Sequence, residues 1–211
     1  MTADSFPDFP ASDVIAVFSK DPILAGIVGS GKPLEPSKSK DIYFKMLSAI
    51  VSQQLSTKAA ATIFARFQDL FPDRYPHPHI VHETPDETLR GAGLSFQKIG
   101  YVRNVAAFAQ GGNLAHAVID AMEDEALIQH LTHIKGVGRW TVEMLLMFAL
   151  ERPDVMPVND LGIQNAMKRH YGLAESGKAL KARMLEIAEN WRPYRTIACK
   201  YLWQSLNNMP K

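Results

Sequence analysis

Apolar residues recur along most of the chain at intervals of three and four, the spacing that builds one face of an α-helix. Runs of alternating β-branched residues bounded by hairpin turns, which would indicate strands, are nearly absent. The pattern therefore predicts an all-α fold of about ten helices with short loops. The clearest stripe predicts a helix over 60–71, and further helices are expected over 41–55, 96–110, 124–134, 138–151, 160–171, 178–190 and 194–207.

Local sequence marks some of the helix ends. Thr84 precedes Pro85 and stands three residues before Glu87, the arrangement of a capping box with proline at the first helical position. The Gly-Gly-Asn run at 111–113 is expected to end the helix before it. Residues 71–87 hold prolines at 72, 76, 78 and 85, which oppose helix, so this stretch is predicted to be the most irregular.

Composition excludes some classes of protein. Hydrophobic residues make up 46% of the 211 residues, which suffices for a packed core. No apolar run reaches the roughly 18 residues that span a bilayer, and the acidic N-terminus lacks a signal pattern, so a cytoplasmic protein without membrane contact is expected. The single cysteine, Cys199, excludes an internal disulfide and a four-cysteine iron–sulfur cluster.

Charge is unevenly distributed within a formal net charge of +1. Residues 131–211 hold 12 Lys and Arg against 7 Asp and Glu, whereas residues 1–130 hold 11 against 15. The basic bias of the second part is compatible with phosphate contacts there, and equally with ordinary variation between solvated faces.

The most specific local motif is a helix–turn–helix pattern over 131–150, with Gly136, Val137 and Gly138 at the turn. Two glycines permit a tight turn, and Val137 between them is expected to plug the seam between the helices. The turn and the next helical turn would then offer backbone N–H groups to a phosphate, a contact that positions a protein on DNA without reading sequence. The alternative is a plain helical hairpin with a glycine turn.

Other groups at this hairpin are assigned to the same contact. Arg139 and Thr141, in the first turn of the second helix, are predicted to bind DNA. Backbone carbonyls of Thr132, Ile134 and Val137 could together hold a monovalent cation, Na⁺ or K⁺, that bridges to the same phosphate. No other cofactor is expected.

Four motifs in order carry a family resemblance. The run IKGVGRWTVEMLLMFAL at 134–150, followed by PVNDLGIQ at 157–164, resembles the helix-hairpin-helix DNA glycosylase superfamily. IVSQQLSTKAAATIFARF at 50–67 and GLSFQKIGYVRNVAAFA at 93–109 resemble, more narrowly, the 3-methyladenine DNA glycosylase II family. The resemblance implies one domain over 1–211, built of two helical lobes with the active site in the cleft between them. It also predicts that the additional N-terminal α/β domain of some bacterial members is missing here.

Asp160 stands where the family has its catalytic aspartate. By itself it would be an ordinary helix cap before Leu161, worth about 1 kcal/mol. Breaking a C1′–N bond builds positive charge on the deoxyribose, and a fixed carboxylate stabilises that charge and orients or deprotonates the attacking water. With the resemblance included, Asp160 is predicted to be the catalytic residue.

Two tryptophans are assigned to a base pocket by the same resemblance, with core packing as the alternative for both. Trp140 occupies the position where the bifunctional glycosylase/lyases of the superfamily have a Schiff-base lysine, so a monofunctional enzyme is predicted. Trp140 and Trp203 match aromatic pocket positions, and an indole face attracts a cationic alkylated purine by about 0.5–2 kcal/mol. Met144, where family members often have an aromatic residue, is expected to soften the pocket.

A loop before the helix at 96–110 is expected to carry the wedge that fills the gap left by a flipped base. The resemblance points to Phe96, with Leu94 as the second choice, and the alternative is that Phe96 anchors the loop to the core. Lys98 is expected to reach a phosphate. Gln53 and Gln54, late in an apolar helix, are expected to line the cleft or to brace the loop, and the alternative is a partly exposed helix end.

Together these features predict a monofunctional glycosylase of base excision repair. It would flip alkylated purines, 3-methyladenine and also 7-methylguanine, out of double-stranded DNA and leave an abasic site. It would act as a monomer, associated with the nucleoid through DNA. Two alternatives stay open: a non-catalytic module that recognises DNA structure, and a glycosylase for a deaminated or etheno base.

Overall fold

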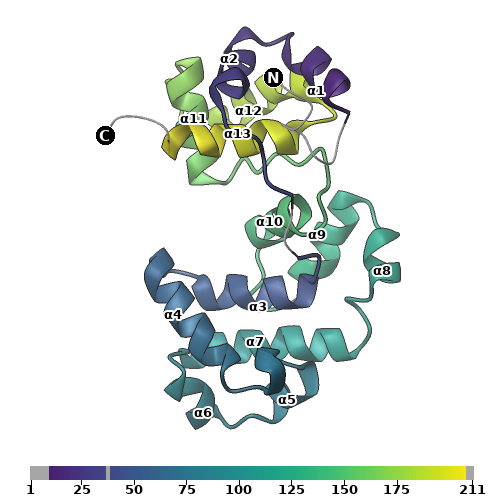
Figure 1. The fold of residues 1–211 in the computed structure, drawn as a ribbon, viewed down its shortest axis with the longest axis vertical. Coiled ribbons are helices and arrows are strands. Elements are labelled where there is room, and N and C mark those ends of the chain that lie inside the picture. Colours follow the sequence, from purple (N-terminus) through teal and green to yellow (C-terminus); the bar gives the residue numbers. More distant parts are fainter. Residues whose placement is uncertain (1–9, 37–38, 208–211) are drawn as a thin grey trace. The chain divides into compact units, whose positions relative to one another are not determined.

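The computed structural model describes residues 10–36 and 39–207, and this part of the chain contains thirteen α-helices, two 3₁₀ helices and no strand (Figure 1). The all-α prediction is therefore confirmed. The helix count was too low because five short helices, of five to nine residues, carry no long apolar stripe. The chain divides into two compact units: residues 39–150 form one, and the segments before and after them form the other.

The 39–150 unit is built around α7, which packs against α3, α5 and α6 (Figure 1). Its apolar face buries Ile99, Val102 and Val105, and the Ser95 hydroxyl caps its first turn by accepting from the Lys98 N–H at 3.2 Å. The helices of this unit are α3 (Ile42–Ser52), α4 (Thr57–Gln68), η2 (Pro72–Arg74), α5 (Pro78–Glu83), α6 (Asp86–Gly91), α7 (Phe96–Gln110), α8 (His116–Asp120), α9 (Asp124–Thr132) and α10 (Arg139–Phe148).

In the proline-rich stretch over 71–87, the structure differs from two predictions. Residues 71–87 include η2 and α5, and Pro78 stands at the first position of α5, where a missing N–H costs no hydrogen bond. The capping box is wrong: α6 begins at Asp86, Pro85 precedes it, and no side chain caps it. The Thr84 hydroxyl instead donates to the Ile80 carbonyl at 2.7 Å.

In the other unit, α13 packs against both α11 and α2, and α12 packs against η3 and α11. Asp160 caps α11, and Gly172 ends it in the left-handed region at φ +63°. The helices of this unit are α1 (Ala11–Phe18), α2 (Pro22–Ser30), α11 (Leu161–Tyr171), α12 (Gly177–Ala188), η3 (Glu189–Trp191) and α13 (Arg195–Asn207).

One carboxylate ties three elements of this second unit together. Asp21 Oδ1 accepts from the first-turn N–H groups of α2, at Ile23 and Leu24, at 3.0 Å each. Asp21 Oδ2 accepts from the Tyr171 hydroxyl at 2.7 Å and from the Trp191 indole N–H at 2.8 Å. Burial, together with the hydrogen bond to Asp21, raises the pKa of Tyr171, so the hydroxyl stays a donor.

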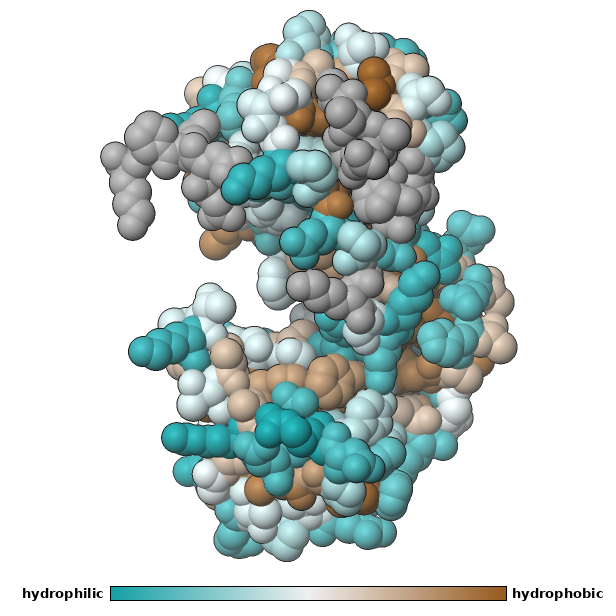
Figure 2. Space-filling view, in the orientation of Figure 1, coloured by the Kyte–Doolittle hydropathy of each residue, from teal (hydrophilic) through white to brown (hydrophobic). Residues whose placement is uncertain are grey.

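The surface is mixed in character. On the face that Figure 2 draws, hydrophilic and hydrophobic side chains are interspersed over both units. Among the helices of the described residues, none combines the length and apolarity that a membrane crossing requires.

We predict that Asp21→Ala lowers the free energy of unfolding by roughly 2–4 kcal/mol, because a buried indole N–H and a helix cap lose their acceptor. Urea denaturation measures the loss. The matched control is Asp13→Ala, since within residues 10–36 and 39–207 exposed Asp13 has a side-chain hydrogen bond only with its neighbour Ser12, and a change within about 0.5 kcal/mol is expected. Equal effects of the two substitutions would contradict the proposed role of Asp21.

Candidate active site

The predicted hairpin is present in the 39–150 unit, where α9 and α10 are joined by residues 133–138. Gly136 has φ +106°, and a Cβ at this position would lie 2.3 Å from the Tyr101 ring. Val137 is buried, as expected of a plug, and its N–H donates to the Ile134 carbonyl at 2.9 Å. Glycine at position 136 is therefore required both by the backbone conformation and by the approach of an aromatic ring.

The hairpin leaves backbone donors at its turn. Within the described part of the chain, the N–H groups of Gly136 and Gly138 donate to no backbone carbonyl. Gly138 is the residue that caps the N-terminus of α10. Backbone N–H groups at a helix N-terminus make a seat for an anion, so the hairpin has the donors that a phosphate contact needs.

Side chains from α7 and from the end of α3 hold this hairpin. Asn104 Nδ2 donates to the Lys135 carbonyl at 3.1 Å, and Gln53 Nε2 donates to the Gly136 carbonyl at 3.1 Å. The Tyr101 ring lies against Gly136, and its hydroxyl accepts from Gln97 Nε2 at 2.8 Å. Sequence reasoning missed the role of Tyr101, since an aromatic residue on an amphipathic helix carries no signal of what it packs against.

Lys98 corrects a prediction. Its ammonium group donates to the Val51 carbonyl at 2.7 Å and to the Gln53 carbonyl at 2.8 Å, at the C-terminal end of α3. Partial burial lowers the pKa of Lys98. Because carbonyls at a helix C-terminus carry partial negative charge, Lys98 is a helix cap rather than a free phosphate ligand.

Arg139 and Thr141 also differ from expectation. The Arg139 guanidinium binds both carboxylate oxygens of Glu125, at 2.9 and 2.7 Å, and its Nε donates to Glu143 at 3.0 Å. The hydrogen bond to Glu125 raises the pKa of Arg139, and the same contact lowers that of Glu125. The side chain thus links α9 to α10 and is neutralised there, while the Thr141 side chain is buried. Both side chains therefore have roles within the protein that the sequence did not predict, and their contact with DNA stays a prediction.

Trp140 and Met144 line one cavity of about 380 Å³ within this unit. Trp140 is 46% exposed, which does not fit a core residue. Gln53 lines this cavity and also holds the hairpin through the Gly136 carbonyl, a contact that the sequence did not predict. The other lining residues are Ala49, Ser52, Gln54 and Thr141.

Phe96 is the first residue of α7 and is 67% exposed, so it does not anchor the loop to the core. The Arg90 guanidinium lies over its ring at 4.6 Å from the centroid. Leu94, the second choice for a wedge, is only 1% exposed, and its carbonyl accepts from Arg90 at 3.2 Å. That burial favours Phe96 over Leu94 as the wedge, because Leu94 would have to leave the core to enter DNA.

Asp160 lies in the other unit, where it is 8% exposed. Its Oδ1 accepts from the Ile163 N–H at 2.8 Å, the expected helix cap, and from the Trp203 indole N–H at 2.8 Å. The structure therefore brings Trp203 directly onto the candidate catalytic carboxylate. This contact was not predicted, since the assignment of Trp203 concerned only a base pocket.

The loop that leads to Asp160 is fixed to α13. Arg195 Nε donates to Asp154 Oδ1 at 2.6 Å, and the Thr196 hydroxyl both donates to the Arg152 carbonyl at 2.6 Å and accepts from the Val155 N–H at 3.0 Å. These contacts restrict the movement of the Asp160 carboxylate at the end of the loop. A catalytic group needs such a fixed position.

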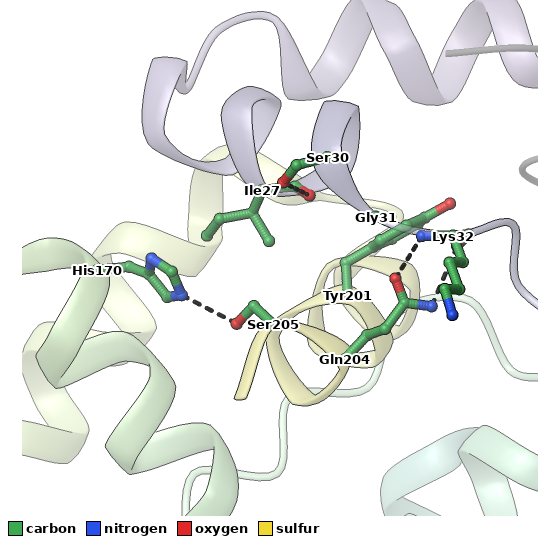
Figure 3. Close-up of a pocket in the computed structure, with 8 residues that line it drawn as sticks. All are labelled: Ile27, Ser30, Gly31, Lys32, His170, Tyr201, Gln204 and Ser205. Carbon is green, nitrogen blue, oxygen red and sulfur yellow. Dashed lines mark hydrogen bonds between the residues drawn. The ribbon is translucent and has the colours of Figure 1, made fainter. Parts of the chain in front are cut away.

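A cavity of about 450 Å³ in the same unit does not involve Asp160 (Figure 3). The Gln204 carboxamide pairs with the backbone of Lys32, accepting from its N–H at 2.6 Å and donating to its carbonyl at 3.1 Å. His170 Nε2 lies 2.9 Å from the Ser205 hydroxyl oxygen. As Figure 3 shows, the contacts of Gln204 fasten the segment after α2 to α13, and the contact between His170 and Ser205 joins α11 to α13.

Comparison with known proteins gives one family. The model of the HhH-GPD superfamily of base excision DNA repair proteins matches residues 47–193. The chain belongs to this superfamily. The resemblance seen in the motifs is thereby confirmed.

Several individual proteins that are similar to this chain are named as DNA glycosylases. A protein of Schizosaccharomyces pombe named DNA-3-methyladenine glycosylase 1 is 36% identical over 184 residues, 86% of this chain and 80% of its own length. A crystal structure of a DNA-3-methyladenine glycosidase from Bacillus halodurans has a TM-score of 0.83 and 34% identity, covering 95% of this chain and 91% of that one. The structure of the Schizosaccharomyces pombe 3-methyladenine DNA glycosylase in complex with abasic DNA has a TM-score of 0.80 and 34% identity, covering 94% and 100%.

The HhH-GPD hairpin yields a prediction about stability. Gly136→Ala should lower the free energy of unfolding by about 1–3 kcal/mol, since alanine is strained at φ +106° and its Cβ meets the Tyr101 ring. Gly138→Ala is the matched control: no atom lies within 4 Å of its Cβ, and its φ of −96° suits any residue. Urea unfolding of both variants checks this, and equal destabilisation at the two positions would show that the Tyr101 contact is unimportant.

Proposed function

We propose that this superfamily member is a monofunctional DNA glycosylase that hydrolyses the N-glycosidic bond of alkylated purines in double-stranded DNA, above all 3-methyladenine. The observation that carries the proposal is Asp160, a carboxylate at the N-terminus of α11 whose Oδ1 is held by two N–H donors. The relatives of about one-third identity that carry the name 3-methyladenine glycosylase support the choice of substrate.

The chemistry needs a fixed negative charge beside the sugar. As the C1′–N bond breaks, positive charge grows on the deoxyribose, and the Asp160 carboxylate would stabilise it and direct the attacking water. The departing base carries its own positive charge when it is alkylated at N3 or N7, so it leaves readily. The exposed Trp140 indole face in its cavity would attract such a base more than a neutral one.

Hydrolysis without strand cleavage is the second part of the proposal. A lyase step needs an amine that forms a Schiff base at C1′. The motif position that would carry the lysine holds Trp140, which has no nucleophilic nitrogen for this reaction. The expected product is an intact abasic site.

DNA contacts are assigned to the hairpin and to α7. The backbone N–H groups at Gly136 and Gly138 would seat a phosphate, and exposed Phe96 would enter the gap that the flipped base leaves. A related glycosylase has been solved in complex with abasic DNA, which supports this assignment. We expect the enzyme to act as a monomer on chromosomal DNA in the cytoplasm.

A monovalent cation at the hairpin stays a prediction. The carbonyls of Thr132, Ile134 and Val137 lie at the end of α9 and in the turn, and carbonyl oxygens suit Na⁺ or K⁺. The Ile134 oxygen already accepts the Val137 N–H at 2.9 Å, but a carbonyl oxygen has a second lone pair for a cation.

The proposed function is tested by base release from DNA treated with a methylating agent. The wild-type chain should release methylpurines, and Asp160→Asn should lower the single-turnover rate by about 10²–10³ or more while DNA binding persists. Chromatography of the freed bases and a binding assay on the same DNA measure the two properties. Binding by both proteins without base release by either would overturn the alkylpurine assignment and leave the two alternatives, a non-catalytic DNA-binding module or a glycosylase for another lesion.

A further inference from the structure

We propose that Trp203 is a positioning residue that holds the Asp160 carboxylate for the reaction, and that Gly162 is a glycine because the indole needs its space. This inference rests on the proposed function, since it concerns how the same carboxylate works. In this proposal Trp203 acts on Asp160, the residue that stabilises charge on the sugar. The motif resemblance had assigned Trp203 to the base pocket instead.

The Ile163 N–H and the Trp203 indole N–H meet the same oxygen of Asp160. The Ile163 N–H is fixed because it belongs to the first turn of α11, and the Trp203 indole is carried by α13, which packs against α11. A carboxylate side chain rotates about two bonds, and a single donor leaves some of that freedom. Two donors from different helices, each at 2.8 Å, fix the plane of the carboxylate as well as its position.

The glycine two residues after Asp160 makes this arrangement possible. A Cβ on Gly162 would lie 2.8 Å from Cδ1 and 2.8 Å from Nε1 of Trp203, and 3.0 Å from Asp160 Oδ1. Gly162 is the second residue of α11 and lies outside the left-handed region, so the backbone itself does not call for glycine. Alanine would favour the helix, which leaves the approach of the indole as the reason for glycine.

Removing the donor while keeping an aromatic ring is the first test. Trp203→Phe should lower the single-turnover rate of base release about tenfold, with the affinity for methylated DNA unchanged, because a charge-assisted hydrogen bond to the reacting carboxylate is lost. The rates for 3-methyladenine and 7-methylguanine should fall by the same factor, since Asp160 acts on the sugar that both share. A changed ratio between the two bases would overturn the proposal and return Trp203 to base recognition.

The second test uses a substitution that suits the fold. Gly162→Ala should slow release of both bases by a common factor, like Trp203→Phe, although alanine is the better helix former. The matched control is Gly26→Ala, in a helix of the same unit, where no atom lies within 4 Å of the new Cβ, and it should keep the wild-type rate. Full activity of Gly162→Ala would contradict the proposal.

A measurement without substrate separates this inference from the proposed function. In a ¹H–¹⁵N spectrum of the free protein, Asp160→Ala should shift the indole resonance of Trp203, assigned with Trp203→Phe, and leave that of Trp140 in place. An unmoved Trp203 resonance would overturn the positioning role even if the enzyme is active. If instead the resonance moves but the wild type releases no methylpurine, the contact stands and the proposed function fails.

Discussion

The chemistry proposed for this chain depends on one oxygen atom. Asp160 Oδ1 accepts the N–H of Ile163 and the indole N–H of Trp203, and this pair of hydrogen bonds turns an ordinary helix cap into a fixed charge. The positive end of the α11 dipole favours that charge. The anchored loop before Asp160 and the absence of a side chain at Gly162 serve the same geometry. A carboxylate held in this way stabilises a developing cation without having to reorganise, which is where most electrostatic catalysis originates.

In the 39–150 unit the organising element is α7. Its side chains hold the hairpin through Tyr101 and Asn104, and Lys98 caps the end of α3, from which Gln53 reaches the hairpin carbonyl. Exposed Phe96 stands at the start of the same helix. The surfaces assigned to a phosphate, to a base and to the gap in the DNA stack are therefore built on one packed scaffold. A rigid scaffold of this kind suits the proposed extrusion of a nucleotide, which needs these surfaces to keep fixed positions.

The spacing of apolar residues was enough to predict the long helices, and the order of the motifs was enough to predict the superfamily. Both signals lie in short continuous stretches of the sequence. The failures concern contacts between distant residues. Lys98 and Arg139 look like phosphate ligands as isolated cations, yet carbonyls and carboxylates from other segments occupy them. Leu94 is apolar and lies on the right loop, but tertiary packing buries it. Trp203 and Asp160 are 43 residues apart in the sequence, so no local sequence pattern predicts their contact.

The most direct test of the central claim is strand analysis of an end-labelled methylated duplex after incubation with the wild-type enzyme. The account predicts that methylpurines are released and that breaks appear at those sites only after alkali treatment, because hydrolysis leaves an intact abasic strand. Breaks without alkali, or a covalent enzyme–DNA complex trapped by borohydride, would contradict it and indicate an amine nucleophile in place of water directed by Asp160.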